Sequence, residues 1–293
     1  MRRIFVGCIP YLFVFLWSTG FIAAKYALPF VEPFTLLFIR MALTVFVFVL
    51  LCAVLKISWL PPRLAMHQVI TGILVHGVYL GGVFAAIKWE MPAGIASIVV
   101  GIQPVLTAFL GWSFYGAKLH VLQWVGLWLG LLGITTVLLS TGHQENITLT
   151  LPAMLAAISA LLGISLGTLY QKHFGQGINL LAGAVWQYLG ATLLMGALAL
   201  GFESRNVTWD SQLILSLGWL VFGLSVTAIL LLMYMIREGE TAKVASYFYL
   251  VPPLASIEAW FLFGESLTIR SVIAIAVTVF GVYLVIRKQK AAN

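Results

Sequence analysis

Long apolar runs, broken by short links that contain proline or glycine, make up most of this chain. A helix needs about 20 predominantly apolar residues to cross the hydrocarbon core of a bilayer. Ten windows meet this requirement: residues 4–28, 33–55, 67–88, 92–115, 120–140, 151–173, 177–201, 212–236, 241–264 and 268–287. The links are too short to contain a soluble domain. The pattern therefore predicts an all-α membrane protein with ten transmembrane helices.

The composition agrees with a location in a lipid bilayer. Of 293 residues, 62% are hydrophobic and 9% are charged, whereas a soluble domain carries far more charged surface. The formal net charge of +7 does not indicate a nucleic-acid partner, because basic residues of membrane proteins gather at the cytoplasmic ends of their helices. The two cysteines, Cys8 and Cys52, fall inside predicted helices and give no disulfide framework.

The basic residues are divided unevenly between the two sides of the predicted helices. With the amino terminus inside, eleven lysines and arginines fall on the cytoplasmic side and four on the other side, while Arg40 lies within the membrane. This bias is the one that the positive-inside rule describes. We therefore expect both termini in the cytoplasm.

The two halves of the chain contain similar segments. PVLTAFLGWSFYGAKLH, which starts at Pro104, aligns with PPLASIEAWFLFGESLT, which starts at Pro252, at an offset of 148 residues. Chance alignment of two apolar helices that end in glycine is the alternative for this single pair. Each half holds five predicted helices, and an odd number inverts the second half relative to the first. The predicted inverted repeats are residues 1–145 and 146–293.

With these features the sequence resembles the drug/metabolite transporter superfamily, in particular its bacterial EamA-type family. The resemblance rests on LWSTGFIAAKYALP in the first predicted helix, on FLFGESLT at the end of the ninth, and on the order of the two halves. It departs from the family pattern at Ala117, which stands where the second half has Glu265. The resemblance implies an exporter or facilitator of small metabolites, often amino acids, in the bacterial inner membrane. It also implies a cavity between helices 1–4 and 6–9, with helices 5 and 10 at the periphery.

Two oppositely charged residues lie at similar depth in different halves. An ionisable side chain within a membrane helix costs about 2.5–3.5 kcal/mol and therefore normally faces a cavity or a partner. Arg40 lies roughly 10 Å inside the second predicted helix, at 1.5 Å per residue, and Glu258 lies about as deep in the ninth. We expect the two either to pair or to bind a polar group of a substrate together. A purely structural ion pair is the alternative.

Other polar side chains occupy predicted helices at substrate-binding depth. Trp17 and Lys25 share one face of the first helix, with snorkelling of Lys25 to the membrane surface as the alternative. His76 and Tyr79 share a face of the third helix, where a histidine is a candidate for proton coupling or a neutral core residue. Four more candidates could orient a ligand or bond a neighbouring helix: Gln103, Tyr170, Gln187 and Tyr234.

The sequence favours a secondary transporter over two other classes of protein. It contains no G-x-x-x-x-G-K-[ST] motif for ATP, so the predicted function is alternating-access transport of a small amphipathic metabolite, such as an amino acid. An intramembrane enzyme acting on a lipid or peptide is the alternative, although H-E-x-x-H is absent and Asp210 is the sole aspartate. A scaffold protein would need longer polar loops. We expect no cofactor and no metal, and a monomer or weak homodimer.

Overall fold

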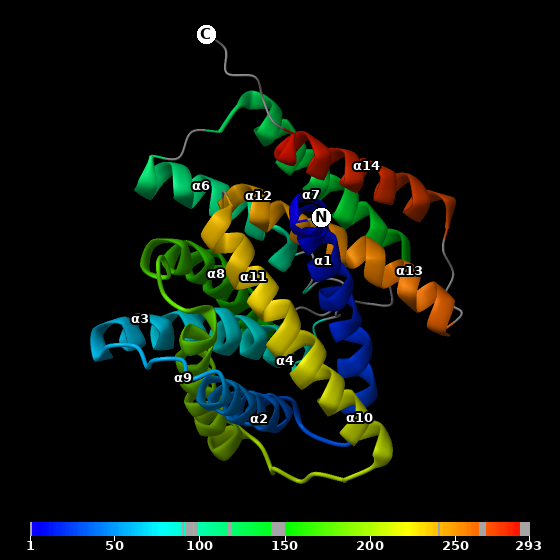
Figure 1. The fold of residues 1–293 in the computed structure, drawn as a ribbon. Helices are drawn as coiled ribbons and strands as arrows, with labels where there is room; N and C mark the ends of the chain where they lie inside the picture. The colour runs from blue at the N-terminus through cyan, green and yellow to red at the C-terminus, as the bar shows by residue number, and fades with distance from the viewer. Residues whose placement is uncertain are drawn as a thin grey trace.

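The computed structural model of the protein describes residues 2–89, 91, 96, 99–116, 119–141, 150–239, 241–263 and 268–287. Within these residues the chain is helical apart from turns, links and one isolated bridge between Val31 and Val207 (Figure 1). The predicted all-α class is therefore confirmed. The helices are α1 (Arg2–Ala27), α2 (Pro33–Val54), α3 (Pro62–Gly72), η1 (Ile73–Val78), α4 (Tyr79–Lys88), α6 (Gln103–Tyr115), α7 (Val121–Thr141), α8 (Leu151–Phe174), α9 (Leu180–Phe202), α10 (Ser211–Trp219), η2 (Leu220–Ala228), α11 (Ile229–Glu238), α12 (Thr241–Ser246), η3 (Tyr247–Leu250), α13 (Val251–Phe263) and α14 (Ile269–Ile286).

Several of these helices have the length and hydropathy of membrane spans. In the described residues six qualify: Pro33–Val54, Pro62–Lys88, Leu151–Phe174, Leu180–Phe202, Ser211–Glu238 and Ile269–Ile286. Shorter apolar helices run over Cys8–Gly20, Val99–Phe114 and Val121–Thr136. Each predicted window contains one or more of these helical segments, with α12, η3 and α13 in the ninth. The count of ten crossings stays a prediction.

Polar caps and prolines explain where many helices begin. The side chains of Thr150, Asn179, Asp210 and Thr268 accept hydrogen bonds from backbone N–H groups in the first turns of α8, α9, α10 and α14. Such caps satisfy donors that have no partner within the helix. Pro33 is the first residue of α2, where the missing N–H of a proline costs nothing.

Two long helices change their winding in the middle. The segments η1 and η2 are π-helical, and they join α3 to α4 and α10 to α11 without a break. A π-helical turn contains more residues than an α-helical turn and is frequently found at functional sites. The two segments begin at residues 73 and 220, a separation close to the offset of 148 residues between the halves of the sequence.

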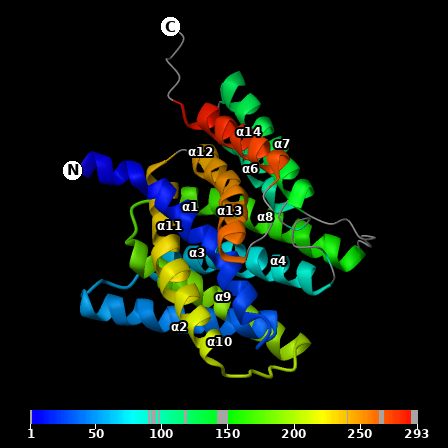
Figure 2. The same cartoon turned by 90° about the vertical axis from the view of Figure 1, so that its right-hand side faces the viewer.

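The helices pack around a buried centre, and α7 and α14 lie together away from it. α2 packs against α9, while α3 and α4 pack against α8 and α9. α7 and α14 run side by side at the end of the molecule remote from α2 (Figures 1 and 2). Their approach depends on glycine, since a Cβ atom at Gly126 would lie 2.5 Å from the carbonyl oxygen of Gly281. The pair corresponds to the fifth and tenth predicted helices.

Apolar side chains cover the outside of this helix bundle as well as its interior. Phe46, Phe114, Leu200 and Phe261 are each at least 67% exposed. In water such a surface would drive association, whereas in a bilayer it contacts lipid chains. The distribution therefore supports a membrane environment independently of helix length.

Candidate functional site

Polar side chains from both halves of the chain are buried together at the centre of the bundle. None of them is more than 7% exposed. They come from α2, α3, η1, α9 and η2. We call this set the central polar cluster: Arg40, Gln68, His76, Gln187, Tyr188 and Ser225.

Ser225 joins α2 and α9 to the π-helical segment η2. Its hydroxyl oxygen accepts a hydrogen bond of 2.9 Å from Nε of Arg40, and its backbone carbonyl accepts one of 3.2 Å from the hydroxyl of Tyr188. Three elements therefore converge on one small residue. The buried hydrogen bonds fix the guanidinium of Arg40 against the second half of the chain.

His76 and Gln187 connect η1 to α9 and α3. The imidazole of His76 stacks on the ring of Tyr188 with centroids 4.4 Å apart, and its Nε2 lies 3.3 Å from Oε1 of Gln187. Because an amide oxygen only accepts, His76 donates through Nε2. Nε2 of Gln187 in turn donates to Oε1 of Gln68 at 2.8 Å, while the buried Nε2 of Gln68 has no hydrogen-bond partner.

Arg40 brings a positive charge into this cluster without a carboxylate beside it. Among the described side chains, the ion pairs are made by other residues, and none joins a carboxylate to Arg40. Tyr79 and Tyr188 are close enough to interact with its charge. A buried cation with no counter-ion is costly. The site is therefore chemically suited to an anionic ligand group such as a carboxylate.

The predicted ion pair between Arg40 and Glu258 is not formed in this structure. Oε1 of Glu258 instead accepts a hydrogen bond of 2.6 Å from the hydroxyl of Ser18, and its buried Oε2 has no partner. The physical reason is that Arg40 lies on a face of α2 that contacts η2, whereas α13, which carries Glu258, packs against α1. Joint binding of a substrate by the two residues stays a prediction.

Trp17 and Tyr79 lie beside the central polar cluster. Tyr79, the first residue of α4, is 6% exposed and lies close to the side chain of Trp17. The indole of Trp17 also packs edge-on against Phe248, with centroids 5.4 Å apart. Since Ser18 follows Trp17 in α1, this helix connects the cluster with Glu258.

Three predicted site residues lie on helices that do not carry the central polar cluster. The hydroxyl of Tyr170 lies 2.6 Å from Nδ1 of His67, near the end of α8, at an apolar groove of about 290 Å³. The guanidinium of Arg237 covers the ring of Tyr234 at 5.7 Å. Gln103 begins α6, is 1% exposed, and its Nε2 has no partner. The side chain of Lys25 lies outside the described residues.

Three members of the cluster were missing from the residues selected by sequence: Gln68, Tyr188 and Ser225. Each is a polar side chain in a mainly apolar predicted span, and Tyr188 directly follows the predicted Gln187. A polar residue in a predicted span is only a weak indication that its side chain belongs to the site. Which of many such side chains face the centre depends on helix register, and the π-helical segments change that register within the third and eighth predicted helices.

Comparison with known proteins shows similarity along nearly the whole chain. The model of the EamA-like transporter family matches residues 6–139 and 151–287. The chain is 30% identical over 227 residues to the "Uncharacterized inner membrane transporter YedA" of Escherichia coli strain K12, covering 77% of this chain and 72% of that protein. It is 24% identical over 288 residues to the "Probable amino-acid metabolite efflux pump" of the same strain, covering 95% and 93%.

The fold has a counterpart among solved structures. One crystal structure aligns with a TM-score of 0.81 at 20% sequence identity, covering 96% of this chain and 97% of that one. At this identity the likeness concerns the fold alone.

Proposed function

The chain belongs to the EamA-like transporter family, and we propose that it is a secondary transporter of small organic metabolites that works by alternating access. A membrane transporter is what the family and the named relatives have in common. The observation that carries the finer proposal is Arg40, a buried cation without a carboxylate partner, held between elements of both halves. A structural core would place such a charge beside a counter-ion or omit it.

We propose that the two halves, residues 1–145 and 146–293, are inverted repeats of five helices each. The two family matches support this division, since one lies in each half. The similar positions of η1 and η2 support it further. Arg40 and Gln187 are also each the eighth residue of their helix, α2 and α9. Inverted repeats that meet at a midplane site are the usual basis of alternating access.

The central polar cluster suits a substrate with a carboxylate. We propose that Arg40 binds this group, with the free amide donor of Gln68 as a second contact. Glu258, which has one unpaired carboxylate oxygen, is placed to attract an amino group. Trp17 and Tyr79 offer aromatic surface to an apolar side chain. An amino acid or a similar amphipathic metabolite has this combination, and the name of one relative also mentions amino-acid metabolites.

The proposed location is the bacterial inner membrane with both termini in the cytoplasm. The division of basic residues supports this orientation. In it, the end of the molecule where α2 begins and α9 ends faces away from the cytoplasm.

Flux measurements on purified protein in liposomes test the proposed function. Liposomes are loaded with unlabelled amino acids, one per sample, and exchange against the same labelled compound is followed. Exchange that depends on the protein and on Arg40 is the expected result. An enzyme, the alternative function, would convert a lipid or peptide without any exchange, and this outcome would reject transport.

A further inference from the structure

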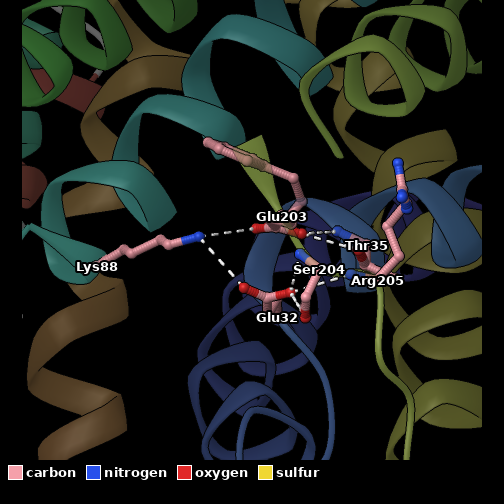
Figure 3. A network of polar contacts seen from close by, with 7 residues as sticks. Glu32, Thr35, Lys88, Glu203, Ser204 and Arg205 are labelled. Atoms are coloured by element: carbon pink, nitrogen blue, oxygen red, sulfur yellow. Dashed lines mark hydrogen bonds and ion pairs between the residues drawn. The ribbon is translucent and has the colours of Figure 1, made fainter. Parts of the chain in front are cut away.

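A buried glutamate fastens α9 to the beginning of α2. Oε1 of Glu203 accepts a hydrogen bond of 2.7 Å from the backbone N–H of Phe34, and Oε2 accepts bonds of 2.7 and 2.8 Å from the N–H and hydroxyl of Thr35 (Figure 3). Glu203 is the residue that directly follows α9, yet it caps the first turn of α2.

A second glutamate makes the reciprocal connection. Glu32, which precedes α2, accepts hydrogen bonds through Oε2 from the N–H and hydroxyl of Ser204, both 2.7 Å, and from the N–H of Arg205 at 3.1 Å. Nζ of Lys88 lies 3.6 Å from Glu32 and 3.5 Å from Glu203 (Figure 3). We call this network the end clasp: Glu32, Thr35, Lys88, Glu203, Ser204 and Arg205, with the N–H of Phe34.

Glu203 is the strongest part of the end clasp. Its side chain is 0% exposed, whereas the side chains of Lys88 and Glu32 are 30% and 33% exposed. Buried hydrogen bonds from a helix N-terminus to a carboxylate are strong, because the N-terminus carries positive partial charge. The ion pairs of Lys88 are longer and partly screened by water.

Among the described residues, no side chain fastens the opposite end of the α2–α9 pair in an equivalent way. There the N-terminus of α9 is capped by its own Asn179, whose Oδ1 accepts from the N–H groups of Leu181 and Ala182 at 2.9 and 3.3 Å. Counting from the start of each helix, Glu203 corresponds to Lys56. An ammonium group only donates and is repelled by a helix N-terminus. Lys56 therefore cannot cap α9 as Glu203 caps α2.

We infer that Glu203 is a positioning residue for the central polar cluster. Arg40 is the eighth residue of α2, roughly 10 Å from its beginning at 1.5 Å per residue, and Gln187 and Tyr188 lie on α9. By fixing α2 against α9 at one end, Glu203 sets the position of Arg40 along the helix axis relative to these side chains. The pair then separates only at the end where Asn179 lies. The significance of this motion for transport rests on the proposed function, but the fastening itself does not.

Distance measurements by pulsed electron paramagnetic resonance test this inference without a substrate. One pair of spin labels is attached at positions 38 and 202, near the end clasp, and a second pair at positions 54 and 180, at the opposite end, after replacement of both native cysteines. In the otherwise unchanged protein we expect a narrow distance distribution for the first pair and a broader one for the second. In Glu203→Gln the distance distribution between positions 38 and 202 should widen at least about twofold.

Matched variants separate the cap from other effects. Lys88→Gln keeps both caps and should leave the first distribution narrow, as should Glu238→Gln, which removes an exposed carboxylate at the end of α11. An unchanged width in Glu203→Gln, or equal widening in Lys88→Gln, would overturn the inference.

Two substitutions of Glu203 show whether its carboxylate charge or only its size holds α2 against α9. Glu203→Asp keeps the carboxylate, whereas Glu203→Gln keeps the shape, so recovery of the narrow distribution by Asp and not by Gln supports the cap. In transport, Glu203→Gln should raise KM about tenfold with a smaller change in maximal rate. A narrow distance distribution in Glu203→Gln together with a wide one in Glu203→Asp would reject the inference. Altered distances in a protein with no flux would instead reject only the proposed function.

Discussion

At the scale of single residues, Arg40 is the group on which substrate binding depends most. Hydrogen bonds to a charged group contribute about 1.5–3 kcal/mol, and 1.4 kcal/mol corresponds to a factor of ten in affinity. We therefore expect Arg40→Gln to weaken binding of a carboxylate substrate by at least about tenfold, as measured by exchange in liposomes. The control is Arg270→Gln, because Arg270 is an exposed cation of α14. Equal substrate affinity in both variants would contradict the assignment.

Glu258 permits a second test at this scale. Because its free oxygen is placed to attract an amino group, Glu258→Gln should raise KM severalfold for an amino acid but not for the matching compound without the amino group. The exposed Glu238 is a suitable control. Glu203 is not, because it belongs to the end clasp. Should KM rise equally for both compounds, Glu258 has no specific role toward the amino group.

The sequence predicted part of the candidate site, and its failures have a physical cause. The sequence selects Arg40, His76 and Gln187 because buried polar groups in membrane helices need partners. His76 does contact Gln187, and Ser225 and Tyr188 link Arg40 to them. Depth along a helix is readable from residue count, so Arg40 and Glu258 were placed at similar depth. The direction in which each side chain points depends on tertiary packing, so their different neighbours were not readable.

At the scale of helices and their contacts, Gly72 is required for the approach of α3 to α9. A Cβ atom at Gly72 would overlap the backbone carbonyl of Gln187, and a backbone group cannot move aside as a flexible side chain can. Overpacking of this kind costs about 1–3 kcal/mol. We expect Gly72→Ala to lower the midpoint of thermal unfolding in detergent by several degrees. Gly218→Ala, with no atom within 4 Å of the new Cβ, is the control. A midpoint equal to that of the control would show that α3 shifts freely.

The end clasp has a pH dependence that follows from Glu32. Hydrogen bonds, first that of the Ser204 hydroxyl, hold the pKa of Glu32 below its ordinary value of 4.5. A carboxyl group with a lowered pKa stabilises the folded state above pH 4.5, and this contribution is lost as the pH falls through the lowered pKa. The unfolding midpoint of Glu32→Gln should therefore lie below that of the unchanged protein at pH 7, and the gap should shrink below pH 4.5. A gap independent of pH would exclude this role of the carboxylate.

Helix positions were readable from the sequence, whereas their internal winding was not. Apolar windows placed helices such as α2 and α9 to within a few residues, because crossing a bilayer demands continuous apolar length. The π-helical turns of η1 and η2 leave the same apolar pattern as α-helical turns. The cap formed by Glu203 was also hidden, since it joins residues 169 positions apart.

At the scale of the whole molecule, orientation in the membrane is the simplest prediction to test. The division of basic residues predicts that Met1 and Asn293 lie together in the cytoplasm. Tags at the two ends should both resist a membrane-impermeant label in intact cells and react after lysis. Reaction of one tag alone in intact cells would imply an odd number of crossings. Such a result would reject the division into two halves of five helices.

The winding of η1 and η2 has a mechanical consequence for the molecule as a whole. A π-helical turn holds surplus chain, and its place along a helix changes when a few carbonyl groups exchange one N–H partner for the next. The π-helical turn can therefore move along the helix while the two ends of the helix keep their positions in the bundle. His76 and Ser225 lie within these stretches, so such a slip would withdraw them from their neighbours with little movement at either face of the bilayer.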